Sequence, residues 1–505
     1  MRLWLACGVV AVAAIVAAAL ILWPSAQVRG RVGRITRLGR LAARLATSRL
    51  GAGLRQLFAG AEGRARIDEA RRRADAERVA AEMGQMKGAL MKLGQMLSFV
   101  SDDVPAEYRL ALSSLQASAP GMDFPLIRDV VEQELGRPLE RAFARFEHEP
   151  LAAASIGQVH RAELPTGEDV VVKVQYPGVA EAIRADLDNA DMLYSMMGML
   201  YSALDPKPVV DELRARIGEE LDYELEAKNQ AAFADLFDGH PYMRVPRVHA
   251  DYSTARVLTS DLVQARRYAE ILELPQAERD RYGEILYRFI LGCVFEFGVF
   301  NGDPHPGNYL FDDEGHVVFL DFGCVKYFPP DMLARWKQLM AAHLSGRPED
   351  FRQLLVEFEF LKPDSDLAVD DVYEYFGYFY EPFREDRVFR FTHEYTRRSV
   401  RMVFAPEGRF AGFSKKLNMP RHFVFVNRIQ WGVYSVLTQL GAEANWHRIH
   451  REFVFGDAPA TGLGRESASF RQSWRKERGL GPGELLLTPD GVRTRSFEAA
   501  AYPFR

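Results

Sequence analysis

Four polar residues occupy positions where they could carry out chemistry. Lys173 is the charged residue inside the hydrophobic run VVVKV. Asp303 and Asn308 bound the loop sequence DPHPGN, and Asp321 directly follows the hydrophobic stretch VVFL. A lysine can neutralise nucleotide phosphates, and carboxylate and amide oxygens are ligands that Mg2+ prefers. The residues therefore predict Mg2+-dependent transfer of an ATP phosphoryl group, with Lys173 and Asp303 as catalytic residues and Asn308 and Asp321 as metal ligands.

The spacing of these residues is typical of protein kinases. An Asp followed five positions later by an Asn, in a loop after a hydrophobic helix, has the spacing of a kinase catalytic loop. The sequence DFG, which starts at Asp321, corresponds to the metal-chelating element that follows. Each motif alone arises often by chance, whereas the joint order behind a lysine-bearing hairpin is much rarer. Phosphoryl transfer mainly needs positioning and charge stabilisation, so we interpret His160 and His305 as structural.

A segment of small residues, AAASIGQ, precedes the lysine hairpin. Small side chains allow backbone N–H groups to approach phosphates, which favours a nucleotide-binding role. An ordinary turn is the alternative for a segment of this composition. The predicted nucleotide-binding residues in it are Ala152, Ala153, Ala154 and Ser155.

Two predicted hairpins position these side chains. Residues 158–164 and 169–176 form the first, around a Pro-Thr-Gly turn, and residues 309–311 and 317–320 form the second. Residues 245–250 and 256–261 are also predicted as strands. Helices are expected for residues 62–118, 124–135, 179–236 and 276–298, and for most of 331–460.

This order of elements predicts an α+β, bilobal protein-kinase-like fold with an N-terminal helical extension and an N-terminal transmembrane helix. The expected divisions are a membrane anchor (1–28), an Arg-rich juxtamembrane segment (29–61), the helical extension (62–121), an N-lobe with a helical insertion (122–265), a helical C-lobe (266–460) and a loose C-terminal tail (461–505).

Residues 3–23 contain no charged side chain and are bracketed by Trp4 and Trp23. At ~1.5 Å per residue, such a helix spans about 30 Å, the thickness of the hydrocarbon core. A cleaved signal peptide is the alternative, although the apolar run is long for one. Eight arginines and no acidic residue follow in residues 29–55, which predicts a cytoplasmic catalytic domain. This stretch fits either an amphipathic helix on anionic lipid or a solvated linker.

Composition excludes several function classes. The 505-residue chain has a net charge of −5, so no global basic field argues for nucleic acid as a partner. Its three cysteines, Cys7, Cys293 and Cys324, form no CxxC pair. The sequence therefore predicts neither a disulfide framework nor a zinc site.

From about residue 82 to 345 the sequence resembles the UbiB/AarF family of atypical kinase-like proteins, called ADCK-like in eukaryotes. The sequence KLGQ, from Lys92 to Gln95, resembles the KxGQ motif of the family's helical extension. The Ala-rich segment resembles the loop that replaces the usual Gly-rich loop. The sequence ELD, from Glu220 to Asp222, resembles the ExD motif, and GDPHPGN resembles the catalytic loop.

The resemblance implies further roles. Lys173 pairs with a helix glutamate, either Glu226 or Glu220, and we favour Glu226. Glu220 and Asp222 then contact Lys92 and Gln95 of the regulatory extension, which covers the pocket where a peptide substrate enters a normal kinase. The chain departs from the family at Asn301, where a histidine is common, and in placing its predicted anchor at the N-terminus.

The function expected from the residues and the resemblance is a membrane-associated, ATP-binding, Mg2+-dependent kinase-like ATPase. The resemblance points to isoprenoid quinone (ubiquinone-type) biosynthesis or lipid homeostasis, with membrane lipids, isoprenoid or quinone precursors and a biosynthetic protein complex as partners. Two alternatives stay open: a small-molecule phosphotransferase, and a nucleotide-gated scaffold without catalysis.

Overall fold

The structure is a computed structural model that describes residues 122–154, 156–187, 218–301, 304–404, 410, 412–418, 420–479, 485–488 and 491–494. The chain divides into two compact units, Met1–Ala119 and Pro120–Arg505, and all described residues belong to the second. The predicted anchor, Arg-rich segment and helical extension therefore lie outside the described residues. Within the described ranges, no helix is both long enough and apolar enough to cross a bilayer.

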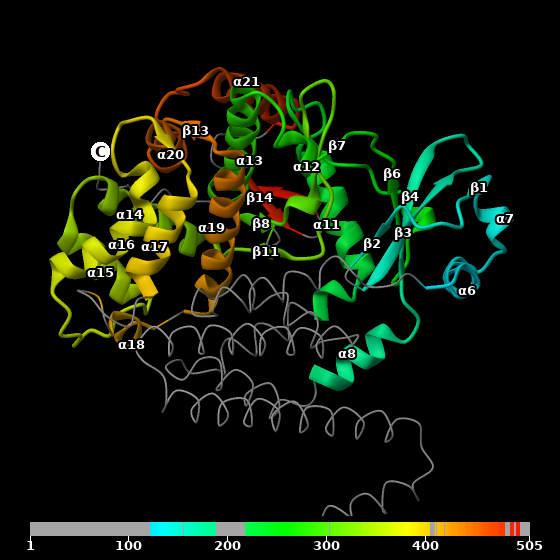
Figure 1. The fold of residues 1–505 in the computed structure, drawn as a ribbon, viewed down its shortest axis with the longest axis horizontal. Coiled ribbons are helices and arrows are strands. Elements are labelled where there is room, and N and C mark those ends of the chain that lie inside the picture. Colours follow the sequence, from blue (N-terminus) through cyan, green and yellow to red (C-terminus); the bar gives the residue numbers. More distant parts are fainter. Residues whose placement is uncertain are drawn as a thin grey trace, which may run out of the picture. The chain divides into compact units, whose positions relative to one another are not determined.

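The N-lobe is an antiparallel sheet with strand order β1-β3-β4-β6, and β2 pairs with β3 (Figure 1). The sequence DVVVKVQ alternates, so Val170, Val172 and Val174 point to one face of β4 and are fully buried against α6 and α7. Lys173 must then point to the opposite face. The bounds are α6 Phe124–Leu135, α7 Leu139–Ala142, β1 Arg145–Phe146, β2 Ala152–Ala153, β3 Gly157–Glu163, β4 Asp169–Gln175 and β6 Val257–Asp261.

Two helices of the N-lobe, α8 (Val179–Leu187) and α11 (Tyr223–Leu236), lie at the ends of the region predicted as helical; residues 188–217 are outside the described ranges. The strand predicted for residues 245–250 is wrong. The chain instead forms β5 (Met243–Arg244), which runs parallel to β10, and a single bridge between Val248 and Ser260. Pro246 explains the difference, because it has no N–H to donate to a ladder. A 3-10 turn, Ala250–Tyr252, follows.

The C-lobe is built around α13 (Gln276–Phe297), and the predicted long helix and second hairpin are confirmed. In the hairpin, Tyr309 is opposite Phe319 and Phe311 is opposite Val317. A second antiparallel pair, β8 with β11, follows the same helix. The remaining bounds here are β7 Arg266–Arg267, α12 Tyr268–Ile271, β8 Val299–Asn301, β9 Tyr309–Phe311, β10 Val317–Phe319, β11 Val325–Tyr327 and the 3-10 turn Pro306–Asn308.

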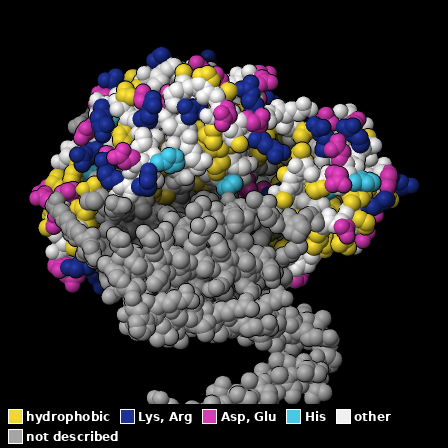
Figure 2. Space-filling model, in the orientation of Figure 1, with side chains coloured by type: hydrophobic (Ala, Val, Ile, Leu, Met, Phe, Trp, Pro, Cys, Tyr) yellow, Lys and Arg dark blue, Asp and Glu magenta, His cyan; other side chains and the backbone are white. Residues whose placement is uncertain are grey.

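Helices continue through the part of residues 331–460 that the structure describes, as predicted. Two of them, α19 and α20, pack on α13 (Figure 1). On the face seen in Figure 2, the Lys and Arg side chains of described residues alternate with Asp and Glu. The bounds are α14 Pro330–Leu344, α15 Pro348–Glu357, α16 Val369–Arg384, β12 Phe389–Arg390, α17 His393–Phe404, α18 Phe413–Lys416, α19 Arg421–Leu440, β13 Glu443–Ala444 and α20 Trp446–Val454.

The predicted loose tail is ordered over much of its length, which corrects the interpretation of residues 461–505. Residues Gly462–Glu477 form helix α21, and the hairpin β14 (Leu485–Thr488) and β15 (Gly491–Thr494) follows. The Thr461 hydroxyl caps the helix by accepting a hydrogen bond from the Gly464 N–H. Trp474 is only 5% exposed, and its burial gives the helix a packing energy that composition did not indicate.

Candidate nucleotide site

The Lys173 ammonium donates two hydrogen bonds to the Glu226 carboxylate, at 2.7 and 2.9 Å. The alternation of β4 turns Lys173 away from the valine face, and α11 carries Glu226 to meet it. The Lys173 side chain is 21% exposed and that of Glu226 is 2% exposed, so this ion pair is largely desolvated. The structure therefore contains the favoured pairing with Glu226.

Charges around the pair set its protonation. Burial opposes the charge on Lys173, but the carboxylate of Glu226, with further contributions from Tyr223 and Asp321, raises the pKa of Lys173 above its ordinary value. Burial also raises the pKa of Glu226, and the Asp321 carboxylate adds to this effect while Lys173 opposes it. The Lys173 ammonium lies 4.9 Å from the centroid of the fully buried Tyr223 ring. Three acidic or phenolic groups thus surround one lysine.

The DFG element lies against the same helix. Asn229 of α11 donates from its side-chain amide to the Phe322 carbonyl at 3.1 Å. A Cβ atom on Gly323 would lie 3.5 Å from the Glu226 carboxylate, an ordinary van der Waals distance, so the DFG backbone lies directly beside Glu226. The Asp321 carboxylate accepts a hydrogen bond of 3.0 Å from the Gly323 N–H. Lys173, Glu226 and Asp321 therefore converge, although they are far apart in the sequence.

Asn308 and Asp321 are brought to the same end of the β9–β10 hairpin. The Leu320 N–H donates to the Asn308 carbonyl at 3.1 Å. Asp321 is the next residue after Leu320, so it lies close to Asn308. Within the loop, His305 accepts a hydrogen bond from the Gly307 N–H at 3.0 Å, in line with a structural role. Asp303 lies outside the described residues. The neighbouring Pro304 is buried against Gly432 of α19.

Asn301, which the sequence alone marked only as a departure from the family pattern, contacts the backbone of Asp321. Its side-chain amide donates to the Asp321 backbone carbonyl at 2.5 Å. This bond ties the end of β8 to the residue that carries the predicted metal ligand. An amide side chain two positions before Asp303 was the available signal, but its partner is 20 positions away and could not be read from the sequence.

The Ala-rich segment forms a short hairpin with the lysine strands. Ala152 pairs with Val159 and Ala153 with Gln158, and the Ala154 N–H donates to the Gly157 carbonyl at 2.9 Å. A Cβ atom on Gly157 would lie 2.2 Å from the Val174 carbonyl oxygen, so a side chain cannot be accommodated there. Ser155 lies outside the described residues.

The predicted regulatory residues fall in different parts of the chain. Asp222 caps α11 by accepting a hydrogen bond of 3.0 Å from the Leu225 N–H. Glu220 is half-buried and ends the helical stretch 218–220, which a turn at Leu221 separates from α11. Lys92 and Gln95 lie outside the described residues. The contact of Glu220 and Asp222 with the extension therefore stays a prediction.

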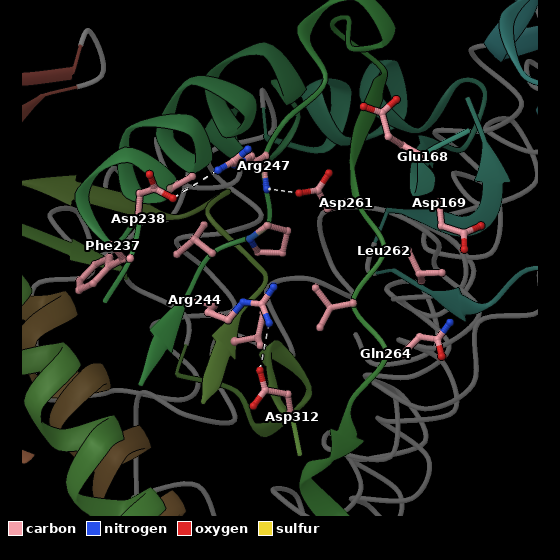
Figure 3. A pocket seen from close by; sticks show the side chains of 16 residues that line it. Glu168, Asp169, Phe237, Asp238, Arg244, Arg247, Asp261, Leu262, Gln264 and Asp312 are labelled. Carbon is pink, nitrogen blue, oxygen red and sulfur yellow. Dashed lines mark hydrogen bonds and ion pairs between the residues drawn. The ribbon is translucent and has the colours of Figure 1, made fainter. Parts of the chain in front are cut away.

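A separate cavity of about 530 Å³ borders residues 261–264, which join the two lobes. In Figure 3 two arginines of its lining point toward carboxylates. Arg244 lies 3.1 Å from Asp312, and Arg247 lies 3.4 Å from Asp238. The residues lining this cavity do not include the converging side chains of the predicted site.

Comparison with known proteins assigns the chain to a family. The family described as the ABC1 atypical kinase-like domain matches residues 114–352. The chain is 34% identical over 269 residues to the mitochondrial atypical kinase COQ8 of Saccharomyces cerevisiae, covering 52% of this chain and 53% of that protein. The chain belongs to the UbiB/AarF family.

A further curated relative and a solved structure also resemble this chain. The chain is 34% identical over 291 residues to the chloroplastic protein ACTIVITY OF BC1 COMPLEX KINASE 8 of Arabidopsis thaliana, covering 55% of this chain and 38% of that protein. A solved structure of Rv3197 from Mycobacterium tuberculosis, in complex with erythromycin, is 30% identical with a TM-score of 0.56 and covers 73% of this chain and 93% of that one. The chain spans about half or less of the length of the two curated relatives. The kinase-like α+β fold is thus shown.

Proposed function

We propose that this UbiB/AarF protein is a Mg2+-dependent, ATP-binding kinase-like ATPase. The observation that carries the proposal is the largely desolvated Lys173–Glu226 pair, at 2.7 Å, with Gly323 of the DFG element packed against Glu226. A lysine held by a helix carboxylate, next to a metal-chelating aspartate, is the arrangement that kinases use to fix ATP phosphates.

The residues present fit a magnesium ion. The Asp321 carboxylate raises the pKa of the buried Glu226, so the site contains negative charge that a cation relieves. Asn308 and Asp321, at one end of the hairpin, offer the hard oxygen donors that Mg2+ prefers. When bound, the ion would neutralise phosphate charge. The Tyr223 hydroxyl is buried and has no hydrogen-bond partner within the described part, so the site also retains a free polar group.

The roles of this chain's own residues follow. Lys173 contacts phosphate oxygens, and Glu226 keeps its ammonium charged and in place. Asn301 fixes the backbone at Asp321, and Asp303 orients or deprotonates the attacking group. The exposed Ala152–Ala153 segment of the Ala-rich hairpin would offer backbone N–H groups to the phosphates.

The proposal extends to the process that the protein serves and to its place at a membrane. Family membership supports isoprenoid quinone biosynthesis or lipid homeostasis as the process served. The uncharged residues 3–23 and the arginines of residues 29–55 support a single-pass anchor with the catalytic domain on the cytoplasmic side. Stimulation of ATP turnover by anionic liposomes, compared with neutral liposomes, tests the role of the arginines, and equal rates would contradict it.

The catalytic proposal is tested with Asp321→Asn, using Asp313→Asn as the matched control. Asp313 lies in the neighbouring turn, its side chain is 87% exposed, and it pairs with Arg266. We expect Asp321→Asn to lose Mg2+-dependent ATP turnover and the control to retain it. Turnover that survives Asp321→Asn would sink the proposal. Wild-type protein that binds ATP without turning it over would favour the scaffold, and a phosphorylated alcohol in place of free phosphate would favour the small-molecule phosphotransferase.

A further inference from the structure

Helix α21 contacts the C-terminal end of α11, the helix that carries Glu226. The Trp474 indole N–H donates to the Asp235 carbonyl at 3.2 Å, and the Arg478 guanidinium lies 2.9 Å from the Asp235 carboxylate. The Arg478 guanidinium also stacks on the Trp474 ring, 4.1 Å from its centroid. Carbonyls in the last turn of a helix have no partner within the helix. Trp474 therefore caps α11 from outside the helix, and Arg478 holds the same turn through the Asp235 side chain.

The same helix also contacts the segment that follows α11. The Tyr242 hydroxyl donates to the Leu463 carbonyl at 2.8 Å, and the buried His240 ring lies 3.3 Å from the Ser467 hydroxyl. The ring of Phe470 packs edge-on against His240, with centroids 4.7 Å apart. Burial lowers the pKa of His240 to about 3, so this contact is made by a neutral ring at physiological pH. Contacts along α21 thus hold both α11 and the chain beyond it.

The other attachment of α21 is to helix α13 of the C-lobe. Arg471 places one guanidinium nitrogen 2.6 Å from both oxygens of Glu296 in α13. At the start of the helix, Thr461 accepts a hydrogen bond of 2.9 Å from the buried Arg288, also in α13. Strands β14 and β15 contact α11 as well, and β14 contacts α13. The C-terminal segment therefore joins α11 to α13.

We propose that α21 is a clamp that holds α11 in the position where Glu226 pairs with Lys173, with Trp474 and Arg478 as positioning residues for the nucleotide site. The proposal rests on the proposed ATP-binding function. Glu226 and Asp235 lie on one helix about 13 Å apart, at ~1.5 Å per residue, so a helix fixed at Asp235 cannot tilt freely at Glu226. In kinases the position of the corresponding helix controls whether the lysine–glutamate pair forms.

The test compares three single variants of the full chain. Trp474→Ala and Arg478→Ala remove contacts to α11, whereas the control Gln472→Ala changes an exposed side chain of the same helix. Nucleotide affinity is measured by calorimetry with Mg-ADP, protection of α11 amides by hydrogen exchange, and stability by thermal unfolding. If Trp474→Ala reduces the paired state of α11 to one part in ten, the apparent Kd rises about tenfold.

We expect a large loss of affinity and of α11 protection for Trp474→Ala, a smaller one for Arg478→Ala, and neither for Gln472→Ala. The Arg478 side chain is 33% exposed, so this variant should fold even if Trp474→Ala does not. The double variant Asp235→Arg with Arg478→Asp should recover what Arg478→Ala loses. If all three variants bind nucleotide as tightly as the wild type while Lys173→Met still weakens binding, the clamp proposal is wrong and the proposed function stands. If Lys173→Met also has no effect, the proposed function fails instead.

Discussion

Two buried ion-pair clusters differ in how completely their charges are satisfied. In the C-lobe, Arg288 donates to Glu284 at 2.6 Å, to Glu452 at 2.7 and 3.0 Å, and to Thr461 at 2.9 Å. A further bond, from the Ala460 N–H, reaches Glu452 at 2.8 Å. The Arg288 side chain is 2% exposed. The guanidinium thus makes four hydrogen bonds, which join α13, α20 and the start of α21.

The cluster around Lys173 is less complete. Its lysine is 21% exposed, its carboxylate is pushed toward the neutral form by burial and by Asp321, and the nearby Tyr223 hydroxyl has no partner within the described residues. Charged groups that lack partners can be stabilised by a bound ligand, whereas groups whose partners all lie within the protein stabilise the fold. The difference teaches that burial of an ion pair does not by itself mark a functional site.

The largest expected effect is on the satisfied cluster. Arg288→Ala leaves Glu284 and Glu452 buried without their cation, and removal of one partner of a buried pair costs about 3–5 kcal/mol of unfolding free energy. Urea unfolding monitored by circular dichroism measures this loss. Mg-nucleotide should not selectively restore the stability, because Arg288 does not contact the proposed site. A loss below about 1 kcal/mol, typical of an exposed pair, would remove the distinction between the clusters.

A smaller effect on stability and a larger one on binding are expected at the incomplete cluster. Lys173→Met keeps the length of the side chain, and Glu226 can take up a proton because burial already raises its pKa. Wild-type protein should gain about 2.7 kcal/mol of stability from Mg-nucleotide at 100 times Kd, and Lys173→Met should gain much less. Thermal unfolding with and without ligand measures both quantities. Equal ligand-induced shifts in the two proteins would place the phosphate contact elsewhere.

The smallest effect concerns a buried histidine of the scaffold. His343 is 1% exposed, both ring nitrogens lack hydrogen-bond partners within the described part, and burial lowers its pKa to about 3. Between pH 6.5 and about 3 the unfolded chain binds a proton there that the folded chain does not, so stability falls as pH decreases through this window. His343→Leu should remove this contribution and stabilise the protein by about 1 kcal/mol at neutral pH.

Unfolding free energies at pH 7.0 and 5.5 test the histidine prediction. Wild type should lose more stability than His343→Leu over this interval, since below the unfolded-state pKa each pH unit approaches about 1.4 kcal/mol for one such group. An identical pH dependence of the two proteins would contradict it. His240 and His450, whose pKa values burial also lowers to about 3, supply further contributions that both proteins share.

Local sequence determined the elements that carry the site. The alternation in DVVVKVQ fixes the face on which Lys173 lies, and the hydrophobic stretch before Asp321 fixes a strand that ends at the DFG element. These features depend on neighbours within a few residues, which is why they could be predicted. The strand expected at residues 245–250 failed for a reason that was also local, because Pro246 cannot join a ladder.

Only the tertiary structure decided which groups meet. The choice of Glu226 over Glu220 for Lys173, the bond from Asn301 to the Asp321 carbonyl, and the docking of Trp474 on Asp235 join residues 53, 20 and 239 positions apart. Helix α21 has a polar sequence that resembles a loose tail, and its order depends on contacts that distant segments supply. Sequence patterns specify the direction of a side chain along its own element, but pairing across the fold depends on how the elements pack.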